Sequence, residues 1–169
     1  TEAIPALMAE SASLGLSQTL AATFGQIKGA FALVMLVDGQ AVAATDPFGF
    51  RPLAFAKYKG GWVVASETNA FDALGVRGGS MPAGTAFVFS PRSTFPFAYD
   101  ADRSFHRNCS FEQVYFSRPD SVTFGVSSHT VRDRLGFLLG RKDAVLADLV
   151  TPVPDSSNAM AAAYANERD

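Results

Sequence analysis

A short run near the end of the chain combines residue types that can hold an anion. Leu146 to Val150 is apolar except for Asp148, Pro152 to Pro154 reads as a turn, and Asp155, Ser156 and Ser157 stand directly before a helical pattern. A helix N-terminus presents unpaired backbone amides, which favour a phosphate or a pyrophosphate. The same side chains are also preferred helix caps, and capping is compatible with anion binding because both use the same amides. The residues therefore indicate an anion-binding corner, a helix cap, or both.

Upstream, residues 111–121 carry a tyrosine and a pair of opposite charges. Tyr115 falls in a run that reads as an apolar strand, where a tyrosine usually packs and bonds its hydroxyl. Arg118 and Asp120 flank Pro119 and read as a surface pair or as turn residues. Cys109 is the only cysteine of the chain, and a lone cysteine is most often a small buried hydrophobe. Taken alone, these residues define no reaction.

Composition limits the class of protein. The chain has 169 residues, of which 48% are hydrophobic and 18% charged, as expected for a foldable globular protein of one or two domains. A net charge of −2 argues against nucleic-acid partners and anionic membrane surfaces. The longest apolar run, Ala30 to Val37, is too short to span a bilayer, and the first residues do not read as a signal peptide. A single cysteine fits a reducing compartment, so the sequence predicts a cytoplasmic location.

The first hundred residues predict two helices followed by antiparallel strands. Apolar residues at helical spacing indicate one helix near Ile4 to Met8 and a second from Leu16 to Ile27, which Gly29 ends. Turn residues then separate short apolar runs. These predict strands over residues 31–37, 40–44, 53–56, 62–65 and 85–90.

Three details of this first part are specific enough to test. Arg51 reads as a structural arginine that pairs with a core carboxylate. Ser66 and Glu67 read as a helix start with supporting hydrogen bonds, after which Phe71 and Leu74 face inward. From residue 90 to residue 107 the pattern loses its period, which suggests a domain edge.

The last part of the chain shows a different pattern. Val131, Leu135, Leu138 and Leu139 predict an amphipathic helix over residues 127–142. A buried strand is expected over residues 146–150, then the loop, and then a helix over residues 158–167. Helix, strand, loop and helix in this order are typical of the start of a βαβ unit with a parallel sheet.

Four segments resemble the amidophosphoribosyltransferase family. Residues 29–34 with 46–53 are similar to the core of class II glutamine amidotransferases, and residues 65–72 to their strand-to-helix element. These two segments are shared with glucosamine-phosphate synthase and asparagine synthetase. Residues 109–121 resemble the junction between the two domains of the family, and residues 150–157 resemble its pyrophosphate loop. The last two segments single out the family.

The resemblance implies the fold class and the domains. The expected fold is mixed α/β (α+β): the C-terminal part of an Ntn-hydrolase αββα glutamine amidotransferase domain, followed by the start of a type I phosphoribosyltransferase α/β domain. The implied boundaries are 1–104 for the first domain, 105–125 for the junction and 126–169 for the second domain. The chain would then be an internal fragment of a longer enzyme.

The resemblance also implies a reaction. Family members are glycosyltransferases that make 5-phosphoribosylamine from phosphoribosyl pyrophosphate and glutamine, in the first step of de novo purine biosynthesis. Glutamine is hydrolysed by an N-terminal Cys nucleophile, and the ammonia crosses an internal channel to displace pyrophosphate. The implied partners are the two substrates and purine nucleotides as regulators, with a homo-oligomer (tetramer) for the full-length protein.

Several residue roles follow from the resemblance alone. Asp155, Ser156 and Ser157 would bind pyrophosphate, with a cis peptide at Asp155-Ser156 and with Ser156 helping to hold a catalytic Mg²⁺. Tyr115, Arg118 and Asp120 would organise the domain junction close to nucleotide-binding positions. In some members a Cys at the position of Cys109 ligates a 4Fe-4S cluster together with three other Cys residues.

The departures from the family are equally specific. The first residue is Thr1, and no segment resembles the Cys-Gly stretch that opens family members. Thr1 is interpreted as a helix cap rather than as a nucleophile. No catalytic residue is therefore assigned, and the chain alone is expected to catalyse neither half-reaction. Two alternatives remain: a truncated, catalytically inactive homologue that serves as a nucleotide-binding or interaction module, and a related sugar-phosphate aminotransferase.

Overall fold

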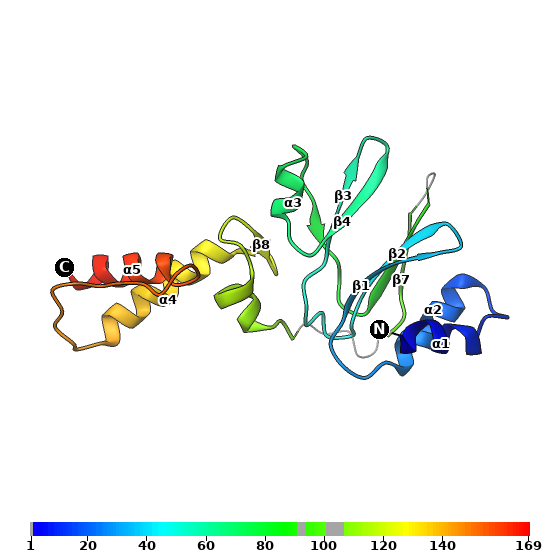
Figure 1. Ribbon diagram of the computed structural model, residues 1–169, viewed down its shortest axis with the longest axis horizontal. Coiled ribbons are helices and arrows are strands. Elements are labelled where there is room, and N and C mark those ends of the chain that lie inside the picture. The colour runs from blue at the N-terminus through cyan, green and yellow to red at the C-terminus, as the bar shows by residue number, and fades with distance from the viewer. Residues whose placement is uncertain (1, 91–93, 101–106) are drawn as a thin grey trace.

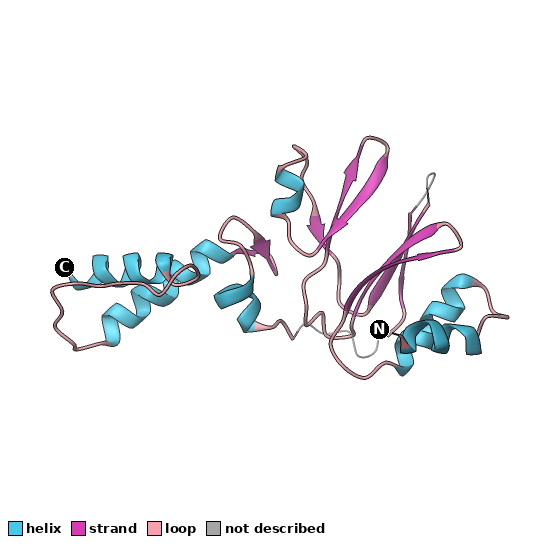
Figure 2. Ribbon diagram, in the orientation of Figure 1, coloured by secondary structure: helices cyan, strands magenta, loops and turns pink. Residues whose placement is uncertain are grey.

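The computed structural model of the chain describes residues 2–90, 94–100 and 107–169. Thr1 and the expected domain boundary at residue 104 lie outside these residues. Figure 1 shows two sheets beside a pair of N-terminal helices, with a helical arm that extends to the opposite end of the molecule. Figure 2 shows that the strands gather in the central part and that the arm is helical.

Two antiparallel sheets form the central part. The first has the strand order β1-β2-β6-β7, from strands Ala32–Val37, Gln40–Thr45, Thr85–Phe89 and Thr94–Ala98. The second has the order β4-β3-β5, from Gly61–Ala65, Ala54–Tyr58 and Gly79–Ser80. Asp38 and Gly39 join β1 to β2 with φ angles of 48° and 75°, which a two-residue hairpin turn of the primed type requires. The expected hairpins are therefore confirmed.

Alternating side chains place the sheets between helices. On β2, Val42 and Ala44 pack with Leu20 and Phe24 of α2 (Leu16–Gln26), next to α1 (Ala3–Glu10). Ala43 faces the other way, into a second core cluster that contains Phe87 of β6 and Phe55, Trp62 and Val64 of the second sheet. Successive residues of a strand point to opposite faces, so one strand serves two cores.

Phe71 of α3 (Asn69–Asp72) covers the outer face of the second sheet at Ala54 and Ala56. The order of layers is thus helices, sheet, sheet, helix. One local prediction about this part was wrong, because Leu74 is exposed. Helix α2 ends at Gln26, one residue before the predicted Ile27, and the aperiodic region contains β7, a strand that was not predicted. Strand β7 carries Pro96 in mid-strand, which obscured the pattern and which an edge strand tolerates.

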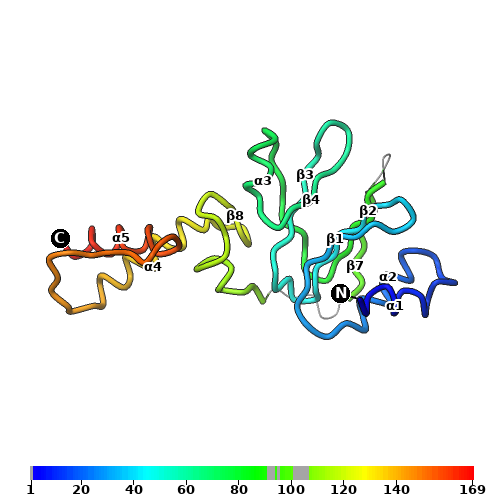
Figure 3. Tube along the Cα trace, in the orientation of Figure 1, coloured from blue at the N-terminus to red at the C-terminus, as the bar shows by residue number. Residues whose placement is uncertain are grey.

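The junction begins with a π-helix, η1 (Glu112–Phe116), where the sequence indicated a strand. The chain then forms a small hairpin from β8 (Val122–Thr123) and β9 (Val126–Ser127). Helix α4 (Ser128–Lys142) follows, with Ser127 as its N-cap accepting a hydrogen bond from the backbone amide of Thr130. Figure 3 traces this route from the sheets into the arm.

Helix α4 buries an unexpected face. Its buried residues are Ser128, Arg132, Gly136 and Gly140, whereas Leu135, Leu138 and Leu139 are exposed. The two glycines allow α5 (Asn158–Arg168) to approach closely, because a Cβ added to Gly136 would lie 2.1 Å from the carbonyl oxygen of Met160. The prediction that the leucines form the inward face was therefore wrong, although both helices were predicted.

The expected buried strand over residues 146–150 is also absent from the described chain. Leu146 and Leu149 are 90% and 79% exposed, and the segment is irregular. A strand needs a neighbour to pair its backbone amides and carbonyls, and no described strand lies beside this one. The apolar composition alone therefore did not produce a strand, and the predicted parallel sheet is not formed. None of the helices in the described ranges is long and apolar enough to cross a membrane.

Candidate functional site at the junction and the C-terminal loop

The buried carboxylate of Glu112 organises the start of the junction. Glu112 is 4% exposed, and its carboxylate lies 3.3 Å from Nε of Arg51. The guanidinium of Arg51 also lies 5.0 Å from the ring centre of Phe116, one turn further along η1. The prediction that Arg51 pairs with a core carboxylate is confirmed.

The pKa of Glu112 reflects this position. Burial raises the pKa of the Glu112 carboxyl, the positive charge of Arg51 partly opposes the rise, and the negative charge of Glu67 adds to it. The buried oxygen Oε2 makes no hydrogen bond, but it is the atom that lies 3.3 Å from Nε of Arg51. The carboxyl group is therefore held in a position where its charged form loses hydration by water.

Glu67 joins the sheets to the second half of the junction. Its carboxylate oxygen Oε2 accepts hydrogen bonds from the backbone amide of Arg118 at 2.8 Å and from the hydroxyl of Ser121 at 2.6 Å. The neighbouring Thr68 hydroxyl accepts a hydrogen bond from the amide of Val122 at 2.9 Å. Glu67 and Thr68 thus support a segment more than fifty residues away, a role that the helix-start reading of residues 66–68 missed.

Arg118 and Asp120 form the pair expected from their spacing. Nε and an Nη nitrogen of Arg118 each lie 3.1 Å from a carboxylate oxygen of Asp120, a two-point contact between side chains that are 65% and 53% exposed. The hydrogen bond from Arg118 lowers the pKa of Asp120. Asp120 also lines a cavity of about 500 Å³ beside Thr68 and Arg77. The pair therefore leaves charged groups accessible at the rim of a cavity.

The environment of Tyr115 differs from the packed position in a strand that the sequence predicted. Tyr115 lies in a π-helix rather than in a strand, and it is exposed. Its ring contacts Phe111 and Phe116, which are exposed as well. These three rings form an aromatic cluster on the junction surface.

Arg132 is a functional candidate that the sequence reading missed. It is 2% exposed, its Nε donates to the carbonyl oxygen of Gln113 at 2.9 Å, and an Nη nitrogen donates to that of Ser117 at 2.6 Å. The signal was present in the sequence, because Ser128, Arg132, Gly136 and Gly140 recur every four residues. Small residues on one face of a helix indicate that another element packs closely against that face. An arginine on the same face is therefore expected to be buried.

The loop before α5 places its polar side chains outside the core. Asp155 is exposed, and Ser156 and Ser157 are half-buried. The Ser157 hydroxyl donates to the carbonyl oxygen of Val153, and Ser157 makes no side-chain capping bond to α5. The capping role expected for this serine is therefore not found. The cis peptide lies at Pro154-Asp155, one bond before the expected position.

The structure does not join the loop directly to the junction. In residues 107–169, no hydrogen bond or ion pair links Asp155, Ser156 or Ser157 to Tyr115, Arg118 or Asp120. The packing of α4 on α5 lies between the two sets of expected site residues.

Metal-binding groups are sparse. Cys109 is a free, half-buried thiol whose backbone amide donates to the carbonyl oxygen of Phe50 at 3.2 Å. The described ranges hold no group of three or more His, Cys, Asp or Glu side chains arranged for a metal ion. A 4Fe-4S cluster takes four thiolates, so this chain by itself does not fit one. Asp155 and Ser156 supply oxygen atoms of the kind that Mg²⁺ prefers, and substrate phosphates and water complete most Mg²⁺ sites.

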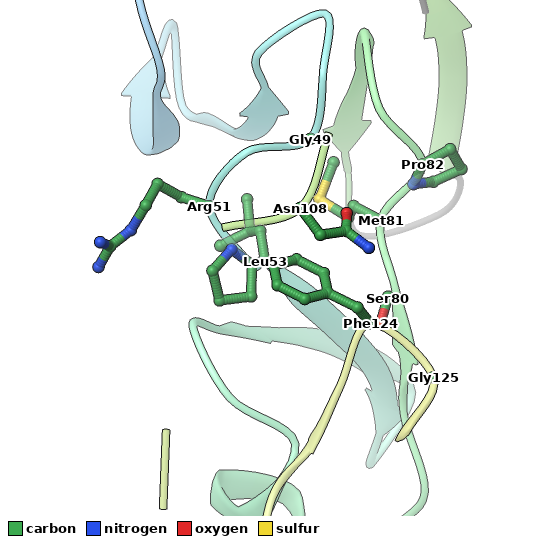
Figure 4. Close-up of a pocket in the computed structure, with 10 residues that line it drawn as sticks. Gly49, Arg51, Leu53, Ser80, Met81, Pro82, Asn108, Phe124 and Gly125 are labelled. Atoms are coloured by element: carbon green, nitrogen blue, oxygen red, sulfur yellow. The ribbon is translucent and has the colours of Figure 1, made fainter. Parts of the chain in front are cut away.

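A second cavity, of about 490 Å³, lies where the β8–β9 hairpin meets the second sheet. Phe124 lies beside Leu53 within it, while the Arg51 side chain points away (Figure 4). Phe124 has a φ of 55°, a left-handed conformation unusual for a bulky residue, at the first position of the hairpin turn. The hairpin thus closes against the sheets through an aromatic side chain.

Comparison with known proteins gives consistent matches. The family model described as a glutamine amidotransferase domain matches residues 1–73. The amidophosphoribosyltransferase of Bacillus subtilis is 36% identical over 168 residues, which are 98% of this chain and 35% of that protein. The amidophosphoribosyltransferase of Mycobacterium tuberculosis is 39% identical over 149 residues, which are 83% of this chain and 27% of that protein. The chain thus spans about a third of the length of these curated relatives.

Solved structures agree along the whole chain. Glutamine phosphoribosylpyrophosphate amidotransferase from B. subtilis, complexed with ADP and GMP, superposes with a TM-score of 0.91 at 34% identity and covers 99% of this chain and 37% of its own. A structure described as the allosteric regulatory enzyme of purine biosynthesis gives a TM-score of 0.92 at 34% identity, over 99% of this chain and 36% of its own. The sheets and the arm therefore both have counterparts in one kind of protein.

Proposed function

Because the chain belongs to the amidophosphoribosyltransferase family, we propose that it is an internal part of an enzyme that makes 5-phosphoribosylamine from phosphoribosyl pyrophosphate and glutamine. One observation carries the proposal: the similarity extends through 98% of the chain, across both the sheets and the α4–α5 arm. The match to the glutamine amidotransferase model ends at residue 73, whereas the similarity to amidophosphoribosyltransferases continues through the rest of the chain.

In this proposal the chain contributes to two domains. The layered sheets belong to an amidotransferase domain of the Ntn-hydrolase type over residues 1–104, residues 105–125 form the junction, and residues 126–169 begin a type I phosphoribosyltransferase domain. The helix–sheet–sheet–helix order of the layers supports the first assignment. Purine nucleotides as regulators and a homo-oligomeric assembly belong to the same proposal.

The loop over residues 152–157 is the proposed pyrophosphate site. The exposure of Asp155 and the lack of a side-chain cap at Ser157 support this role, because the first amides of α5 keep their capacity to bind an anion. The Asp155 and Ser156 oxygens would also hold Mg²⁺, which neutralises charge on the phosphates when bound. Arg118 and Asp120 would organise the domain junction close to the positions that bind a regulatory nucleotide.

Alanine substitution in the loop tests this assignment in the full-length protein. Asp155→Ala and Ser156→Ala should each lower ammonia-dependent phosphoribosylamine formation by about 10- to 100-fold, as the loss of one or two hydrogen bonds to charged groups does. Basal glutamine hydrolysis should stay unchanged, because the loop lies outside the amidotransferase domain. Initial rates of both reactions are the measurement.

Asp148→Ala is the matched control, since Asp148 is an exposed aspartate that precedes residues 150–157. It should leave both rates unchanged. Equal loss of both activities in the loop variants, with an unchanged melting temperature, would count against the loop assignment. A wild-type protein that forms no phosphoribosylamine would instead contradict the proposed enzyme and favour a non-catalytic module.

A further inference from the structure

A buried guanidinium lies between the junction and the arm. Arg132 is 2% exposed, and burial lowers its pKa, while the negative charge of Glu67 acts in the opposite direction. Within the described ranges it forms no ion pair, and the partners of its two hydrogen bonds are backbone carbonyls. Burying a charge is unfavourable unless its hydrogen bonds are specific, and an apolar side chain would fill the space at less cost. The retained charge therefore points to a geometric role.

The two carbonyls that Arg132 holds lie at the ends of one turn. Gln113 is the second residue of the π-helix and Ser117 directly follows it, so one side chain holds both sides of the turn that carries Tyr115. The same two residues bond to Thr123 through their side chains, at 3.0 Å in each case. The turn is thus held from α4 and from the β8–β9 hairpin.

The sheets hold the next residues of the same segment. Glu67 accepts hydrogen bonds from the amide of Arg118 and the hydroxyl of Ser121, on either side of Asp120. The segment from Gln113 to Ser121 is therefore fixed by a cation from the arm and by an anion from the sheets. The position of this segment therefore depends on the position of the arm and on the position of the sheets.

The arm transmits this position to the loop. Gly136 contacts Met160 and Gly140 contacts Tyr164, and in each pair the second residue lies 24 positions after the first. The equal offset means that α4 and α5 run in parallel, so Ser156, 24 positions after Arg132, lies near the level of Arg132 along the pair. A shift of Arg132 would move the pyrophosphate loop relative to the junction.

We propose that Arg132 is a positioning residue that sets the relation between the Arg118–Asp120 pair and the Asp155–Ser157 loop. It acts through the carbonyls of Gln113 and Ser117 and touches no substrate. The inference rests on the proposed function, in which ammonia from one domain must meet phosphoribosyl pyrophosphate in the other. Loss of Arg132 should therefore impair the transfer between domains more than either half-reaction.

The test measures three rates in the full-length protein. They are glutamine hydrolysis alone, phosphoribosylamine formation from ammonia, and phosphoribosylamine formation from glutamine. In Arg132→Gln the glutamine-supported rate should fall about tenfold relative to the ammonia-supported rate, since a displacement of the order of 1 Å has effects of this size or larger. Arg132→Lys, which keeps the charge but lacks the forked donor, should give a smaller fall.

Arg134→Gln is the matched control, because Arg134 lies on the same helix, is exposed, and contacts the ring of Phe137. It should leave the ratio unchanged. If Arg132→Gln does not fold, Ser121→Ala removes one of the bonds to Glu67 on the other side of the segment and should lower the same ratio. Amide exchange at Arg118 and Ser121 should become faster in both variants, a readout that does not depend on activity.

Three results would overturn the inference: an unchanged ratio in Arg132→Gln, an equal loss of all three rates with an unchanged melting temperature, or unchanged amide exchange at Arg118 and Ser121 when Arg132 is substituted. A wild-type protein that makes no phosphoribosylamine from ammonia would instead contradict the proposed function. Amide exchange would still test the positioning role in that case.

Discussion

Single polar side chains fix the corners of the central sheets, and Asp46 is the clearest case. It is fully buried, and its carboxylate accepts hydrogen bonds from the amides of Phe31, Phe48 and Phe50 at 2.9 to 3.3 Å. The sequence indicated a turn at Asp46 to Gly49, and the structure shows that the aspartate builds that turn and also ties it to the start of β1.

We expect Asp46→Asn to destabilise the protein by about 2 kcal/mol, because an amide oxygen accepts fewer and weaker hydrogen bonds than a carboxylate. Urea unfolding followed by tryptophan fluorescence is the measurement, with Trp62 as the reporter. Asp38→Asn in the exposed β1–β2 turn is the control and should be close to neutral, since asparagine also tolerates a positive φ. A similar small effect at both positions would contradict the role of Asp46.

Glu112 gives a prediction on pH. Its pKa in the folded state is raised above the ordinary value of 4.5, so the folded protein binds this proton more tightly than the unfolded chain. The resulting stabilisation is full below pH 4.5 and is lost as the pH rises through the raised pKa. Glu112→Gln cannot titrate, so the stability of the wild type relative to this variant should decrease as the pH rises above 4.5. Urea midpoints of both proteins between pH 4 and pH 8 measure this change. Wild-type stability that rises relative to the variant as the pH rises would contradict the assignment.

At the scale of elements, helix packing depends on where a Cβ can fit. A Cβ at Gly136 of α4 would lie 2.1 Å from the backbone of α5, whereas one at Gly25 of α2 meets nothing within 4 Å. Gly136→Ala must push the two helices apart, because the obstacle is backbone rather than a flexible side chain.

We therefore expect Gly136→Ala to destabilise the protein by about 1–3 kcal/mol, as overpacking does. Gly25→Ala should stabilise it by about 0.5–1 kcal/mol through helix propensity alone. The two substitutions are chemically identical, so opposite shifts of the thermal midpoint attribute the difference to packing. Equal shifts of the same sign would show that the α4–α5 contact is looser than the structure indicates.

Over the whole molecule, polar contacts of buried or half-buried side chains join the sheets to the arm through the junction. Glu67, Arg118 and Ser121 lie on one side of the junction, and Arg132 lies on the other. Hydrogen bonds depend on distance and angle more steeply than apolar contacts do, so such a junction has a defined geometry. Under the proposed function, substitutions at Arg132 are therefore expected to weaken the coupling between the two half-reactions, while the loop variants lower one of them.

Much of the fold was predictable because its signals are local. Helical spacing predicted α1, α2, α4 and α5, and turn residues such as Asp38 and Gly39 predicted the hairpins. The exceptions have local causes as well. Pro96 hid an edge strand, and the apolar residues of η1 have the same composition as a strand.

The sequence by itself determined the family, the antiparallel hairpins, the Arg118–Asp120 pair and a polar loop ahead of a helix. Each depends on residues that are close together in the chain or on motifs that can be read in order. Only the tertiary structure decided that Glu67 and Arg132 hold the junction and that residues 146–150 form no strand. The physical reason is the same in each case: a buried charge or a strand is stabilised by partners far away in sequence, and which partners are within reach is settled by packing.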